Sequence, residues 1–262
     1  DSFSSQYNLE ATIEEVYLPS TLKTMHPYAF LFQNKIKGIY GNNEFVSADN
    51  KFIWQYDYWG RKVLCTFTSG ANIREYSIPE GIQVVEHYVF YNSQIESVEF
   101  PSTLCQCPSG YVFELCHNLK SFSGKYATKD GKALCEDGTI NVLACAGITE
   151  YTTPDEITAI GYGVFVNKDN LESITLSDNV KHIYGSNNFG YCDNLRTVTL
   201  SAGLLDLGSH TFYPAPKLEA VYCRAINPPG YKPPMSGEGV ISEYFDFDFY
   251  VSHRGFERNS NG

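Results

Sequence analysis

A chain of 262 residues with 43% hydrophobic residues can bury a sizeable core, which argues against global disorder. Its net charge of −11 argues against nucleic acid and anionic membranes as partners, because both bind basic surfaces. No apolar run reaches the roughly 18 to 20 residues of a spanning helix, and the many Tyr, Phe, Pro and Gly residues favour strands and turns.

The sequence is built from internal repeats, as two of its stretches show. "IREYSIPEGIQVVEHYVFYNSQIESVEFPSTL" begins at Ile73, and "ITEYTTPDEITAIGYGVFVNKDNLESITLSDNV" begins at Ile148. When their first residues are aligned, the following positions coincide: Tyr76 with Tyr151, Pro79 with Pro154, Ile82 with Ile157, Val85 with Ile160, and Phe90 with Phe165.

The same template recurs in chain order. An aliphatic residue opens each unit: Ile13, Ile36, Ile73, Ile95, Leu119, Ile148, Leu171, Leu195 and Leu218. Apolar residues usually follow three and five positions later, and another aliphatic stands nine positions after the opening one: Leu22, Ile82, Leu104, Ile157, Val180 and Leu204. An aromatic residue comes eight or nine positions after that: Phe30, Phe90, Phe113, Phe165, Phe189 and Phe212.

This pattern predicts a solenoid. Short alternating segments such as "LESITL" (171–176) and "LRTVTL" (195–200) are expected to be strands with alternate residues inward, each pairing with the strand of the next unit. The ninth-position aliphatic and the Phe would close the far side of the same core. One unit cannot bury its own apolar face, so the units must stack, and the Phe residues should form a single file.

Two interruptions break the spacing. Ile36 to Ile73 is 37 residues and Leu119 to Ile148 is 29, against 22 for Ile73 to Ile95. We expect inserts near 42–70 and 123–146, each a small antiparallel hairpin. Both contain an Asp turn, Asp49-Asn50 or Asp130-Gly131, whose second residue suits a positive φ.

The first insert, "NKFIWQYDYWGRK", concentrates aromatic side chains. When the inserts are aligned on the Asp turn, Ile53 matches Leu134 and is expected to face the core, so that Phe52, Trp54 and Tyr56 take the opposite face. Their partners in the second insert are Ala133, Cys135 and Asp137, so the architecture does not require aromatics here.

Exposed aromatic side chains mark recognition sites. The ligand-binding residues predicted from the sequence are Phe52, Trp54, Tyr56, Tyr58 and Trp59. The alternative is that the insert folds back and buries these rings against the neighbouring repeat.

Segments such as "SIPEGIQVVEHYVF", "EFPSTL" and "NFGYCDNLRTVTL" resemble the BspA-like (treponemal-type) leucine-rich repeat family over about residues 13–223. The chain departs from the motif at Thr153, where an aliphatic is expected, and at Ser177 and Ser201, where Pro is expected. The resemblance implies a β-rich leucine-rich-repeat solenoid of the α/β horseshoe class with little regular helix, a parallel sheet of about nine strands, and two β-hairpin inserts.

The repeats stop at "RAINPPGYKPP", where four prolines forbid regular ladder pairing. The following "YFDFDFYVSHRGFE" resembles the C-terminal cap of the family. We therefore expect a solenoid over 1–226 and a cap over 227–262.

The sequence contains few candidates for catalytic or metal-binding residues. The chain has eight cysteines, whose pairing the sequence does not settle. Cys116 and Cys192 both stand three residues before a strand, which predicts buried thiols. Cys105 and Cys107 could form a disulfide or half of a soft-metal site. The His residues are scattered, and no hydrolase, phosphate-binding or dinucleotide motif is present, so we expect no catalytic residues, no metal and no cofactor.

The sequence thus predicts a non-enzymatic recognition scaffold that binds a macromolecule, protein or glycan, through distributed contacts and aromatic anchors. The family resemblance implies an exported bacterial protein, often attached to the cell surface and active in adhesion to host or matrix proteins. The chain starts at Asp1 without a signal peptide, which predicts that an export segment has been removed, and any lipid anchor would lie outside this chain. The alternatives are glycan binding in nutrient capture and a structural spacer.

Overall fold

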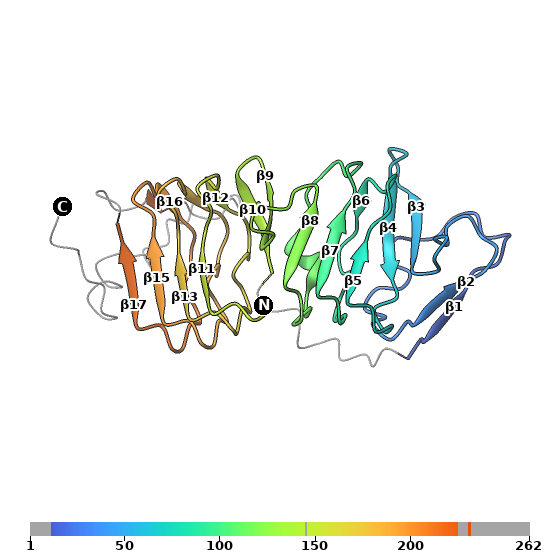
Figure 1. Ribbon diagram of the computed structural model, residues 1–262, viewed down its shortest axis with the longest axis horizontal. Helices are drawn as coiled ribbons and strands as arrows, with labels where there is room; N and C mark the ends of the chain where they lie inside the picture. Colours follow the sequence, from blue (N-terminus) through green and yellow to red (C-terminus); the bar gives the residue numbers. More distant parts are fainter. Residues whose placement is uncertain (1–11, 145, 225–229, 232–262) are drawn as a thin grey trace, which may run out of the picture. The chain divides into compact units, whose positions relative to one another are not determined.

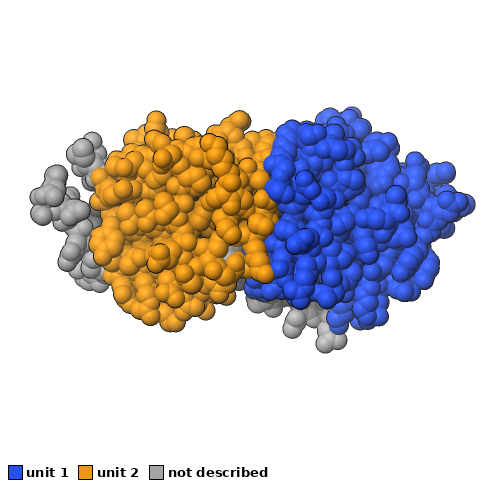
Figure 2. Space-filling model, in the orientation of Figure 1, with its two compact units in different colours: residues 1–119, 123–125 blue, residues 120–122, 126–262 orange. Residues whose placement is uncertain are grey.

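The computed structural model describes residues 12–144 and 146–224, together with the backbone of 230–231. The chain divides into two compact units, one of residues 1–119 and 123–125 and the other of 120–122 and 126–262 (Figure 2). The fold is a β-solenoid of about nine turns, as the repeats predict. Among the described residues the only helical element is a 3-10 turn, η2 (Gly110–Phe113).

Within each unit, every predicted repeat contributes one strand to a first row (Figure 1). These strands are β1 (Glu15–Tyr17), β2 (Gly38–Tyr40), β5 (Glu75–Ser77), β7 (Ser97–Phe100), β8 (Ser121–Gly124), β11 (Glu150–Thr152), β13 (Ser173–Thr175), β15 (Thr197–Leu200) and β17 (Ala220–Cys223). The ladder is parallel and in register, with Ile174 opposite Val198 and Val198 opposite Val221. These three side chains are buried while their strand neighbours are partly exposed, so the predicted alternation is confirmed.

A second row of two-residue strands, which the sequence did not predict, lies on the opposite side of each coil. Its members are β6 (Val84–Val85), β12 (Ala159–Ile160), β14 (His182–Ile183), β16 (Asp206–Leu207) and β18 (Gly230–Tyr231). The last four pair in parallel in the order β18-β16-β14-β12. The coils that carry β11 to β17 are therefore joined to one another by backbone hydrogen bonds on two sides.

Phenylalanine rings stack along the core between the two rows. In the second unit Phe189 stacks on Phe165 at 5.0 Å between centroids and on Phe212 at 5.4 Å, with the rings within 12° of parallel. In the first unit Phe90 stacks on Phe113 at 5.4 Å with an interplanar angle of 1°. The predicted single file is therefore confirmed for Phe165, Phe189 and Phe212 in the second unit and for Phe90 and Phe113 in the first.

The predicted buried thiols are also confirmed. Cys116 Sγ donates to the carbonyl oxygen of Phe90 at 2.8 Å, and Cys192 Sγ donates to that of Phe165 at the same distance. In both cases the thiol reaches the preceding coil at its stacked Phe. This repeat position therefore holds a small buried side chain that also donates a hydrogen bond to a backbone carbonyl.

The polar side chains that depart from the family motif form hydrogen bonds. Thr153 is 1% exposed, and its Oγ1 accepts a 2.8 Å hydrogen bond from the backbone N–H of Ser177. The buried Ser201 hydroxyl donates to the carbonyl oxygen of Val180. Polar side chains are tolerated at these turns because each finds a backbone partner in an adjacent coil.

Both interruptions form the antiparallel hairpins that the sequence predicts. The first pairs β3 (Phe52–Tyr56) with β4 (Lys62–Phe67), and the second pairs β9 (Ala133–Glu136) with β10 (Thr139–Leu143). Asn50 and Gly131 have φ values of 59° and 66°, the positive φ expected after the Asp of each turn. Beyond the prediction, β4 pairs in parallel with β6 and β10 with β12, so each hairpin extends the second row.

The first-row ladder is grouped around these inserts. Its hydrogen-bonded sets are β1-β2, β5-β7-β8 and β11-β13-β15-β17, so that neighbouring sets are separated in sequence by a hairpin. The predicted boundary between a solenoid over 1–226 and a cap over 227–262 stays a prediction, because the cap lies outside the described residues apart from the backbone of 230–231.

Truncation of the middle ring of the second stack should be costly. We expect Phe189→Ala to lower the free energy of unfolding by about 3–5 kcal/mol, since it removes a fully buried ring with neighbours on both sides. Chemical denaturation measures this, with Tyr162→Ala as control: Tyr162 is 78% exposed and should change stability by no more than about 0.5 kcal/mol. Equal losses in the two variants would contradict the stacked core.

The thiols should differ in reactivity according to their place in the coil. At about pH 8 we expect iodoacetamide to modify exposed Cys105 first, while buried Cys116 and Cys192 react only on unfolding. Cys65 should be equally protected, because burial, aided by Glu86, raises its pKa to about 12. Peptide mass mapping over time checks this, and early modification of Cys192 in native protein would be the contrary result.

Candidate functional site

The first hairpin places its five predicted aromatic residues in three different environments. Phe52 is buried at 3% exposure and Trp54 is half-buried, while Tyr56, Tyr58 and Trp59 are 53%, 95% and 74% exposed. The expectation that Phe52, Trp54 and Tyr56 share a solvent-facing side is therefore wrong for Phe52.

Phe52 is buried because both faces of β3 are packed. Ile53 enters the core cluster of the first coils, and the Phe52 ring meets the edge of Tyr76 at 6.4 Å in the next coil. Cys65 forms a bulge in β4, since Ile53 pairs with Thr66 and Trp54 with Leu64. A strand covered on both sides does not follow the alternation of a half-buried strand.

Trp54 lies at the border between this core and solvent. Its ring makes edge contacts with Phe45 at 5.9 Å and with Tyr56 at 5.2 Å. The Lys62 ammonium lies 4.3 Å from the centroid of the indole, within the range of a cation–π interaction. Trp54 is thus held by its neighbours while part of its surface stays open.

The hairpin tip, Asp57 to Arg61, is ordered by one carboxylate. Asp57 Oδ1 accepts the backbone N–H groups of Trp59 and Arg61, both at 2.9 Å, and Oδ2 accepts Arg61 Nε at 2.6 Å. Gly60 takes a φ of 75°, which an L side chain rarely adopts. The Arg61 guanidinium lies 4.9 Å from the centroid of the Trp59 ring, so an arginine and a tryptophan face solvent as one stacked pair.

The carboxylate of Asp57 stays ionised under ordinary conditions. Desolvation alone would raise its pKa, but the hydrogen bonds from Arg61 and Trp59 outweigh it and hold the pKa below the usual aspartate value. The tip is therefore preorganised wherever this acid is charged.

The second hairpin has the same antiparallel pairing as the first but lacks the aromatic tip. Its turn repeats the geometry of the first: Thr128 Oγ1 donates to Asp130 Oδ1 at 2.6 Å, as Ser47 Oγ does to Asp49 Oδ1 at 2.7 Å. Its strands, however, join directly through Asp137 and Gly138, both with positive φ. In the first hairpin the matching stretch, between Gln55 and Val63, holds Tyr56–Lys62, so Tyr58, Trp59 and Arg61 belong to an extension that the fold does not need.

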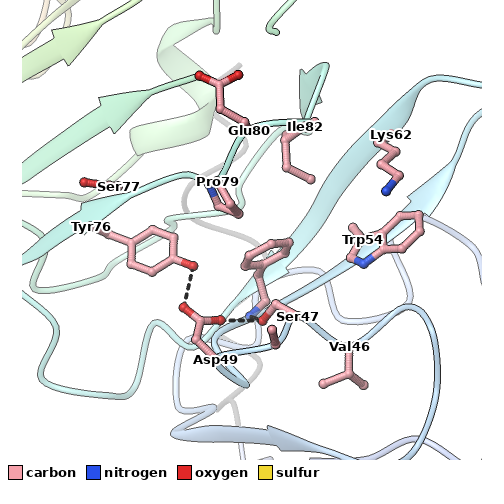
Figure 3. Close-up of a pocket in the computed structure, with 13 residues that line it drawn as sticks. Val46, Ser47, Asp49, Trp54, Lys62, Tyr76, Ser77, Pro79, Glu80 and Ile82 are labelled. Carbon is pink, nitrogen blue, oxygen red and sulfur yellow. Dashed lines mark hydrogen bonds between the residues drawn. The ribbon is translucent and has the colours of Figure 1, made fainter. Parts of the chain in front are cut away.

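A groove of about 360 Å³ opens between β3 and the coil of β5 (Figure 3). Trp54 and Lys62 lie on one side, with Tyr76 and Ser77 across from them and Asp49 between. The remaining lining is Val46, Ser47, Ala48, Phe52, Pro79, Glu80, Gly81 and Ile82. Of the residues predicted from sequence, the groove brings together Phe52 and Trp54, whereas Tyr58 and Trp59 are on the tip.

The polar side of the groove is built on a tyrosine–aspartate pair. Tyr76 Oη donates to Asp49 Oδ2 at 2.8 Å, and burial and this carboxylate both raise the tyrosine pKa. Sequence reasoning found Asp49 as a turn residue only and missed Tyr76, Lys62 and Glu80. The recurrence of Tyr76 at Tyr151 signalled a structural position, and nothing in the sequence places Lys62 over Trp54.

In the described part of the chain, no group of three or more His, Cys, Asp or Glu side chains is arranged to hold a metal ion. Across the same residues, no helix combines the length and apolarity needed to cross a bilayer. The raised pKa values of Cys65 and Tyr151 arise from burial and mark core groups.

Comparison with known proteins identifies the family. The model of the BspA type leucine rich repeat region matches residues 64–130 and 142–226 in six copies. The chain belongs to this family. The resemblance seen in the repeats is thereby confirmed. The comparison with curated proteins gave no match.

One of the similar solved structures supports the fold. A leucine rich cell surface protein from Faecalibacterium prausnitzii is 14% identical, with a TM-score of 0.51 over 89% of this chain and 84% of its own. The leucine rich repeat protein of T. pallidum is 21% identical over 67% of this chain and 80% of its own, with a TM-score of 0.45. The pneumococcal vaccine antigen PcpA is 16% identical over 80% of this chain and 51% of its own, with a TM-score of 0.45.

Acid should loosen the hairpin tip. The low pKa of Asp57 means that its contribution is complete above the ordinary aspartate range and is lost as the pH falls through the folded-state pKa. We expect the indole N–H signal of Trp59 to move toward its disordered position at acid pH, and in Asp57→Ala at every pH. An acid titration by two-dimensional NMR measures this, with the signal of Trp54 as internal control, and a Trp59 signal indifferent to Asp57→Ala would contradict the structure.

Proposed function

We propose that this protein is a non-enzymatic recognition scaffold of the bacterial cell surface or extracellular space, which adheres to a host or matrix protein through the tip of its first hairpin. The observation that carries the proposal is the exposure of Tyr58 and Trp59, at 95% and 74%, on a rigid turn. Trp, Tyr and Arg are the residues that most often supply binding energy at protein interfaces.

Preorganisation supports the same role. Asp57 holds the backbone of the tip and the Arg61 guanidinium at once, and Arg61 Nη1 also donates to Gln106 Oε1 at 3.4 Å. Side chains fixed before binding lose less conformational entropy on association. These hydrogen bonds hold the Trp59–Arg61 pair in place before a partner binds, as expected for a preorganised recognition site.

The proposed location rests on the family, whose members are typically exported, and agrees with the acidic charge of the chain. Of the alternatives, a structural spacer would call for buried aromatics, whereas the tip is open to solvent. Glycan capture by Trp59 or Tyr58 stays an alternative, and the choice of probes below separates it from protein adhesion.

Removing either aromatic anchor should weaken adhesion. We expect the protein to bind at least one of immobilised fibronectin, laminin and collagen, and Trp59→Ala or Tyr58→Ala to weaken that binding about tenfold or more. Solid-phase binding with a concentration series measures it. The matched control is Tyr162→Ala, which removes an equally exposed aromatic far along the sequence and should bind as the parent does.

Two results would overturn the proposal. One is that no matrix protein is captured. The other is that Trp59→Ala and Tyr58→Ala bind as tightly as the parent chain. Binding that survives on deglycosylated matrix protein favours protein adhesion, whereas binding lost on deglycosylation favours the glycan alternative.

A further inference from the structure

We propose that the groove beside Trp54 is a second binding site, separate from the hairpin tip, and that it takes one ring of a neutral saccharide. The groove lies between the base of the first hairpin and the coil of β5, and both walls belong to the first compact unit. Its walls differ in chemistry: one is aromatic and the other carries hydroxyl and carboxylate groups (Figure 3).

The aromatic wall suits the apolar face of a pyranose. Trp54 is fixed by edge contacts with Phe45 and Tyr56, and the buried Phe52 ring also lines the groove. Carbon-bound hydrogens of a sugar ring pack on such surfaces, since aromatic faces carry the negative lobe of the ring quadrupole. A ligand with no apolar face would leave this wall unsatisfied.

The polar wall suits neighbouring hydroxyl groups. Each hydroxyl of a sugar can donate and accept, so a ring lying in the groove can use acceptors on one side and a donor on the other. Asp49 supplies carboxylate oxygens that are held in place by Ser47 and Tyr76 at 2.7 and 2.8 Å. Lys62 supplies an ammonium donor from the opposite side of the groove.

The charges of the lining favour a neutral ligand. Asp49 and Glu80 disfavour an anion, and Lys62, whose ammonium lies over the Trp54 ring, disfavours a cation. Glu80 is already bound by the backbone N–H and hydroxyl of Ser102, at 2.9 and 3.0 Å, and so stays charged without a ligand. The volume of about 360 Å³ lies near the lower end of the roughly 300–1,000 Å³ typical of small-molecule sites.

The second hairpin shows that these residues are not needed for folding. Val63 pairs with Val84 as Thr139 pairs with Ala159, so the two hairpins can be matched residue by residue. At the groove positions the second hairpin has Cys135 where the first has Trp54, and Gly138 before its second strand where the first has Lys62. The turn residues that build the hairpin are kept, while the residues that give the groove its aromatic wall and its cation are not.

The test is titration of the whole chain with a panel of neutral methyl glycosides and their linear oligomers, followed by NMR at the Trp54 indole N–H and by calorimetry. At least one neutral saccharide should shift the Trp54 signal. Trp54→Ala and Lys62→Met should each weaken its binding about tenfold or more, whereas Trp59→Ala should leave it unchanged. If Trp54→Ala unfolds, Lys62→Met still tests saccharide binding in the groove, because methionine keeps the length and the apolar stem of the lysine side chain.

Several outcomes would overturn the inference. They are the absence of binding by any neutral saccharide, tighter binding of uronic acid or amino sugar glycosides, occupation of the groove by a short peptide instead, and affinity that is lost in Trp59→Ala but kept in Lys62→Met. None of these outcomes bears on adhesion by the tip, which is tested separately with Trp59→Ala and Tyr58→Ala. Failure of the groove proposal can therefore be distinguished from failure of the proposed function.

Discussion

The structure depends on the stacking of coils that cannot be stable alone. Each coil contributes a strand of three or four residues to the first row, too little to hold a conformation by itself. Within each set of the first row, parallel hydrogen bonds join a coil to its neighbour, and the Phe rings, 5.0 to 5.4 Å apart in the second unit, fill the space between the two rows. Since all these contacts join adjacent coils, each repeat gains its stability from the next.

This constraint also explains why two long inserts are tolerated. An insert that left the stack would expose the core of both neighbouring coils. Each hairpin instead places its second strand in the second row, where β4 pairs with β6 and β10 with β12. The bulges at Cys65 and Asn141 occur at the same step of the two hairpins. The inserts are therefore continuations of the solenoid at their base, and only their tips extend beyond it.

The repeat pattern was enough to predict the strands, the stacked Phe residues, the buried Cys116 and Cys192 and the antiparallel hairpins, because each follows from a periodic need to bury apolar side chains. It was not enough for the second row, whose pairs of residues are too short to show a period. It also failed for Phe52, since period-2 reasoning assumes one covered face. The groove depends on how Trp54, Lys62 and Tyr76 converge from different elements, which a linear sequence does not encode locally.

The two tyrosines that follow the hairpins show how a core position can become part of a surface. Tyr151 is 5% exposed in the same core cluster as Ala133, and its hydroxyl makes no hydrogen bond within the described residues. In the first hairpin, the positions of Ala133 and Leu143 hold Phe52 and Phe67. The rings of Phe52 and Phe67 both contact Tyr76, which is half-buried and donates its hydroxyl to Asp49. The two hairpins share their strand pairing, so the different surroundings of the two tyrosines go with the side chains of the paired strands, which are small or aliphatic in one hairpin and aromatic in the other.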